Sequence, residues 1–173
     1  MRIYEGSPRQ DFEEVFRSIG AYLDRRGMKE ILLAEAPDGF IVQGLVLVGS
    51  GAWSDTMGRQ TKETLTFLDD DISRFMDEGI ARRNTRTQVA PNAAGYYERA
   101  LRVIGRYMDE QKPTDVFFFE QDGNFVVRML KSTQAGSRHV LFEFTTEDVQ
   151  KMVSAGPGGR RRDAAGSGSG RGG

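Results

Sequence analysis

The chain contains an internal repeat, in which two stretches have similar sequences. Residues Phe12 to Leu45 align without a gap on Tyr97 to Leu130, 85 positions later, and ten of the 34 aligned pairs are identical. The identical pairs begin at Glu13, Arg17, Ile19, Gly20, Tyr22, Asp24, Glu35, Phe40, Val42 and Leu45. A later part matches at a shift of 77, as in Leu65 and Phe142, because the intervening loop is eight residues longer in the first copy. The repeat predicts two units of one architecture.

Each copy is predicted to form a helix, three strands and a second helix. In the first copy, apolar residues at helical spacing indicate a helix over 8–26, with Ser7 as its N-cap. Strands follow over 30–35, 40–48 and 62–68, and Asp69 opens the next helix. The second copy repeats this order, with Asn92 as the N-cap, strands over 115–120, 125–131 and 138–144, and a last helix capped by Thr145.

The expected fold class is α+β, an internal duplication of an α-βββ-α unit. Three strands need cover on their apolar face, so repeats 7–83 and 92–154 should share one globular domain, 1–155. The copies could join edge to edge or pack around a pseudo-two-fold axis, as a symmetric dimer would. The aromatic run 117–119 predicts that strand 115–120 is central or covered on both faces.

Composition excludes several classes of protein. The chain has no cysteine, which rules out a disulfide framework, thiol catalysis and cysteine-ligated metal. No apolar run resembles a signal peptide or a bilayer span, so a cytoplasmic protein is expected. Residues 156–173 are rich in glycine and arginine and are predicted to be a disordered tail. This tail carries a net charge of +3 and leaves −4 on residues 1–155, which disfavours a basic nucleic-acid-binding face on the body.

Residues for catalysis or metal binding are scarce. The only histidine, His139, falls inside a predicted strand. The chain therefore has too few histidines for a histidine metal site, and the one it has is poorly placed for a catalytic triad. The run Asp69-Asp70-Asp71 could offer oxygen ligands to Mg²⁺ or Ca²⁺, but helix capping is the favoured interpretation. We therefore expect no cofactor and no metal site.

The repeated polar residues allow two interpretations. Glu35 and Glu120 end equivalent strands, and could either meet as a carboxylate pair for acid/base chemistry or discourage edge pairing as strand-end charges. The pairs Asp24/Asp109 and Arg17/Arg102 are interpreted as charges on an exposed helix flank. The repeated Gly20/Gly105 indicates a point where another backbone, a strand or the partner helix, passes close to each first helix.

The loop that only the first copy contains holds the candidate partner-binding residues. They are Trp53, Met57 and Arg59, which belong to residue types that are over-represented at interface hot spots. Trp53 could instead fold back over the sheet and cap the core.

The order helix, three strands, helix over residues 8–154 resembles bacterial type III secretion chaperones and the related YbjN-like proteins. The resemblance is one of architecture, and this chain departs from it by its complete second copy. It implies a non-enzymatic, chaperone-like protein that binds another protein. A homodimer is a separate expectation, which does not come from the resemblance. The alternatives are a carboxylate- or metal-dependent hydrolase using residues between the repeats, and weak nucleic-acid binding through Arg160, Arg161 and Arg162.

Overall fold

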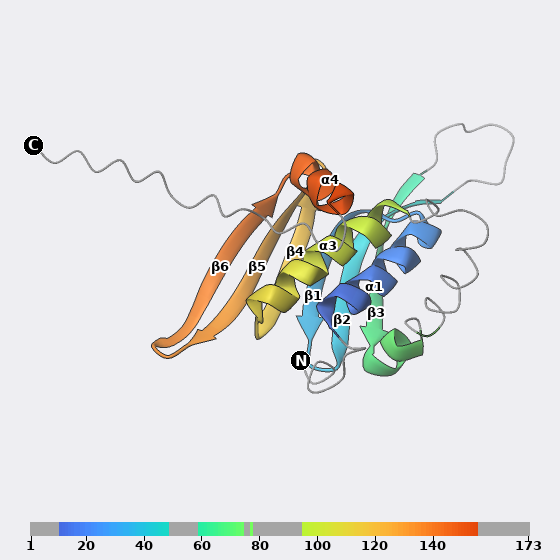
Figure 1. Ribbon diagram of the computed structural model, residues 1–173. Helices are drawn as coiled ribbons and strands as arrows, with labels where there is room; N and C mark the ends of the chain where they lie inside the picture. Colours follow the sequence, from blue (N-terminus) through green and yellow to red (C-terminus); the bar gives the residue numbers. More distant parts are fainter. Residues whose placement is uncertain (1–10, 49–58, 75–76, 78–94, 156–173) are drawn as a thin grey trace, which may run out of the picture.

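The computed structural model describes residues 11–48, 59–74, 77 and 95–155. The fold is α+β, as predicted: six antiparallel strands form one sheet, and the labelled helices lie over one face of it (Figure 1). These helices are α1 (Phe12–Arg26), α3 (Tyr96–Gln111) and α4 (Thr146–Ser154), and residues 69–74 are also helical. The strands are β1 (Lys29–Ala36), β2 (Gly39–Val48), β3 (Arg59–Leu68), β4 (Asp115–Gln121), β5 (Asn124–Thr133) and β6 (Gly136–Phe144). Among the described residues, no helix has both the length and the apolar character needed to cross a membrane.

The strand order is symmetric about the sheet centre. It runs β3-β2-β1-β4-β5-β6, so β1 and β4 join the two halves and β4 is central, as the aromatic run predicted. At this junction Leu33 pairs with Phe118, the residue 85 positions later in the chain. On either side, Leu32 pairs with Phe119 and Ala34 with Phe117, so counterparts exchange places across the ladder. Equivalent edges of the two halves therefore meet, as in an isologous interface.

The helix termini differ from the sequence expectation. Helix α1 begins at Phe12 with Asp11 as its N-cap, whereas Ser7 lies outside the described residues. Helix α3 begins at Tyr96 after Gly95, which has no side chain to cap it, and Asn92 is likewise outside the described residues. At α4 the prediction is confirmed, because Thr145 forms a capping box with Asp148.

The core lies between α1, α3 and the sheet. Phe16 of α1 is fully buried and packs edge-on against Phe40 and Phe118, with ring centroids 5.4 and 5.6 Å apart. The repeated tyrosines make matched contacts toward the sheet edges, where Tyr22 meets Phe67 at 5.4 Å and Tyr107 meets Phe144 at 5.2 Å. One apolar layer therefore serves both halves.

The two repeated glycines mark the crossing of α1 and α3, which lie side by side in Figure 1. A Cβ at Gly20 would overlap the carbonyl group of Tyr97, and a Cβ at Gly105 would overlap the carbonyl group of Phe12. The predicted close approach is confirmed, and the approaching backbone is that of the partner helix. The helices can come this close because glycine has only a hydrogen atom where other residues have a Cβ.

Gly20→Ala should destabilise the fold, because the new methyl group meets backbone that cannot move aside as a side chain could. Alanine ordinarily favours a helix over glycine by about 1 kcal/mol, but overpacking of this kind costs roughly 1–3 kcal/mol or more. We expect denaturant unfolding to show a net loss of about 1–2 kcal/mol for Gly20→Ala and a similar loss for Gly105→Ala. Glu110→Ala, at an exposed position of α3, is the control and should stay near wild type. Wild-type stability for both glycine variants would contradict the close packing.

Candidate functional site

The repeated aspartates cap helices in the opposite half. The carboxylate of Asp24 in α1 accepts hydrogen bonds from the backbone N–H groups of Tyr97 (3.0 Å) and Glu98 (2.8 Å) at the start of α3. Asp109 in α3 does the same for Phe12 (2.8 Å) and Glu13 (3.0 Å) at the start of α1. The interpretation of these aspartates as surface charges was wrong. They satisfy helix-terminal donors that the local sequence leaves open.

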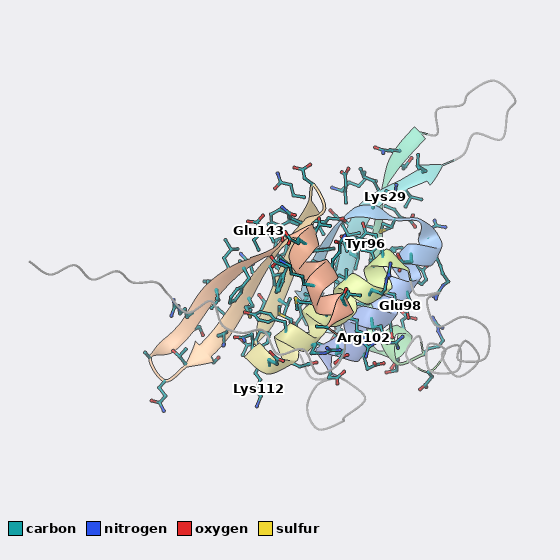
Figure 2. All side chains as sticks on the ribbon, turned by 45° about the horizontal axis from the view of Figure 1, so that its top comes forward. Lys29, Tyr96, Glu98, Arg102, Lys112 and Glu143 are labelled. Carbon is teal, nitrogen blue, oxygen red and sulfur yellow. The ribbon has the colours of Figure 1, made fainter. Side chains whose placement is uncertain are left out.

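The repeated arginines also reach across the helix pair, and for Arg17 this corrects the assignment to an exposed flank. The Arg17 side chain is 4% exposed and contacts Glu98 of α3 at 3.2 Å and Glu14 of its own helix at 2.9 Å. Its counterpart Arg102 contacts Glu13 of α1 at 2.8 Å but is 44% exposed. Figure 2 places Glu98 and Arg102 together on α3, beside α1. The two halves thus use matched ion pairs at different depths.

Glu35 and Glu120 lie at opposite ends of the β1–β4 ladder. Glu35 accepts a hydrogen bond from the N–H group of Val116 at 3.2 Å, and Glu120 accepts one from Ile31 at 3.4 Å. The ladder register places these contacts about four residues apart, or about 13 Å along the strands. Burial raises the pKa of Glu35. The structure therefore does not bring the two carboxylates together, and both bind backbone groups of the neighbouring strand.

One contact of Glu120 has no equivalent in the other half. The Tyr97 hydroxyl donates to the Glu120 carboxylate at 2.5 Å, and burial together with this bond raises the tyrosine pKa. The residue equivalent to Tyr97 is Phe12, which has no hydroxyl group. Beside the pair is a cavity of about 490 Å³, also lined by Met28, Lys29 and Tyr96. Two of the carboxylates that line it, Asp24 and Glu120, already accept hydrogen bonds from protein donors.

The face of the sheet opposite the helices is the best candidate interface. None of the described helices covers it, and it presents Ile41 at 37% exposure and Leu141 at 69%. Two cross-strand rows run over its centre. The Phe117 row is Thr66, Ile41, Ala34, Phe117, Arg128 and Leu141, and the Phe119 row is Thr64, Gln43, Leu32, Phe119, Val126 and Glu143.

These rows have the composition of a binding surface. Their middle is aliphatic and aromatic, whereas threonines and Glu143 lie toward the edge strands β3 and β6. The Arg128 guanidinium stacks 5.3 Å from the centre of the Phe117 ring. An apolar centre with aromatic residues and arginine inside a polar rim is typical of protein–protein interfaces.

The other sequence candidates are distributed as follows. Arg59 begins β3, while Trp53 and Met57 lie outside the described residues. His139 is exposed on β6, paired with Leu130 of β5. Sequence reasoning missed the open face, although alternation in β4 was visible as Phe117 and Phe119 flanking the buried Phe118. Among the described residues, no three histidine, aspartate or glutamate side chains gather as metal ligands would.

The unequal depth of the two arginines gives a matched pair of variants. Arg17→Met removes a buried guanidinium and leaves the carboxylate of Glu98, also buried, without this ion-pair partner, for which we expect a loss of about 3 kcal/mol. Arg102→Met, at the equivalent but exposed position, should cost less than about 1 kcal/mol. Urea unfolding of both variants measures the difference. Equal losses would contradict the asymmetry.

Asp109 predicts a pH dependence of stability. Burial raises its pKa from 3.8 to about 6, with the carboxylates of Asp11 and Glu13 adding to the shift against two backbone hydrogen bonds. Because the folded-state pKa exceeds the unfolded one, folding takes up a proton between roughly pH 4 and 6, and this group's contribution to stability falls as pH rises through that window. Asp109→Asn cannot titrate and should remove that slope. Unfolding free energies of both proteins from pH 4 to 7.5 test this, and parallel profiles would contradict it.

Comparisons of the chain with known protein families, with curated proteins and with solved structures give no match. Two features of the described residues bear on function: the matched contacts that hold the two halves together, and the apolar face that the described helices leave open.

Proposed function

We propose that the chain is an internally duplicated, non-enzymatic protein-binding module with a chaperone-like architecture. In this proposal the two repeats form a single-chain counterpart of a symmetric dimer. Support comes from the exchange of identical residues across the junction: Asp24 and Asp109 cap opposite helices, and Gly20 and Gly105 face opposite backbones. Duplication followed by fusion accounts for the retention of these residues in both copies.

The observation that carries a binding function is the open face of the sheet. A sheet buries one face against helices and normally has a polar opposite face when that face meets water. Here the opposite face instead carries Leu32, Phe117, Phe119 and Val126 at its centre, with Leu141 exposed beside them. Exposed apolar patches of this kind mark interaction sites. The partner in this proposal is another protein chain that covers the two central rows.

The hydrolase alternative has less support. Glu35 and Glu120 lie at opposite ends of their ladder, and each holds a backbone N–H group of the facing strand. An acid/base pair needs both carboxyl groups within reach of one substrate bond. The nucleic-acid alternative depends on Arg160, Arg161 and Arg162, which lie outside the described residues.

The test compares baits that differ only on the open face. Tagged wild-type chain is purified from its source cells, its partner is identified and made pure, and the binding affinity is measured for Phe119→Asp and Arg99→Glu. Phe119→Asp should weaken binding at least about tenfold, as loss of an interface anchor does, whereas Arg99→Glu, on the helix side, should leave binding unchanged.

A triple Trp53→Ala, Met57→Ala, Arg59→Ala variant tests the loop in the same assay. A partner lost only in that variant would move the site to the β2–β3 loop. Binding that none of these variants affects would overturn the proposal for the open face.

A further inference from the structure

We propose that the open face is covered by a second copy of this chain, packed sheet to sheet with its two-fold axis running across the strands. This inference rests on the proposed function, because it uses the same face, and it specifies the occupant. Three observations lead to it: the size of the face, its charge and the arrangement of its two rows.

The size of the face suits a stable homodimer. Six strands about 4.8 Å apart span about 29 Å, and strands of 7 to 10 residues are roughly 24–34 Å long. The face therefore covers roughly 700–1,000 Å² per copy in projection, a range that includes the value of about 800 Å² per partner in specific protein complexes. Two stacked sheets pack about 10 Å apart with interdigitating side chains. A second copy supplies a surface of the same extent and the same hand of twist.

The charges of the central rows are balanced. They contain one cation, Arg128, and one anion, Glu143, on the adjacent strands β5 and β6. A face of a single sign would repel its own copy, whereas a balanced face can pair with itself. Both residues are exposed, and each has one contact within its own copy. Arg128 stacks over Phe117, and Glu143 accepts a hydrogen bond from Asn124 at 3.2 Å.

The arrangement of the rows selects the axis. If the axis ran along the strands, each row would face itself in reverse, and Arg128 would meet Ile41 while Glu143 met Thr64. If it runs across the strands, each strand faces itself and the Phe117 row faces the Phe119 row. Arg128 then faces Val126 of the second copy with Glu143 on the next strand, about 5 Å to the side. Only this axis brings opposite charges together, twice by symmetry.

The axis also suits the apolar centre. Phe117 meets Phe119 of the second copy, and Ala34 meets Leu32, so the smallest side chain of one row lies opposite a larger one. Aromatic side chains contribute much of the energy in such interfaces. The same face thus provides an aromatic centre flanked by two ion pairs.

The experiment is sedimentation velocity on the full chain from 1 to 100 µM, with four variants. Wild type should be a dimer across the upper part of this range. Arg128→Glu and Glu143→Arg should each raise the dissociation constant at least about tenfold, and the double variant Arg128→Glu/Glu143→Arg should return it to within about threefold of wild type. Arg99→Glu, which changes charge on the helix side, is the control and should match wild type. Circular dichroism confirms that each variant folds.

Three results would overturn the inference. The first is a full chain that is monomeric at 100 µM, and the second is a dimer that neither charge reversal weakens. The third is a chain that dimerises only when residues 156–173 are deleted, which would make the tail the occupant of the face. If the chain is monomeric and Phe119→Asp abolishes binding of a different protein, the second copy is excluded while the proposed function stands. If neither self-association nor partner binding responds to the face variants, both fail.

Discussion

The close crossing of α1 and α3 is the constraint on which the rest of the structure depends. Gly20 and Gly105 remove the side chains that would hold the helices apart, so each backbone contacts the other directly. At that distance Asp24 reaches the first amides of α3 and Asp109 reaches those of α1. The β1–β4 ladder beneath then has to align counterpart residues. Steric fit and helix capping thus meet at one contact, above a ladder that pairs counterpart residues.

The sequence predicted the helices and strands, but it did not predict which distant residues their side chains contact. Periodicity and turn residues located the strands to within a few positions, and Thr145 was a local cap that could be recognised as such. Asp24 gave no such signal, because its hydrogen-bond donors are 73 and 74 residues away in the chain. Charges at helical spacing were interpreted as solvated, although Arg17 is buried. Identity between the repeats was the available clue, since solvated residues have little reason to be retained twice.

The open face was hidden for a different reason. Alternation in a strand shows that two faces differ, but β4 is apolar on both, and one chain alone does not reveal which face the helices cover. Phe118 is buried beneath α1, whereas Phe117 and Phe119 are half-buried on the other side. Which face of β4 is covered depends on the position of α1 and α3 relative to the sheet, and that position comes only from the structure.

Joining the halves in one chain has a consequence for how they diverge. In a homodimer every substitution is present on both sides of the axis, so no site can change alone. Here Phe12 and Tyr97 hold equivalent places, yet only Tyr97 has a hydroxyl group to donate to Glu120. A covalent linkage thus allows the two halves to differ at one position while their other contacts stay matched.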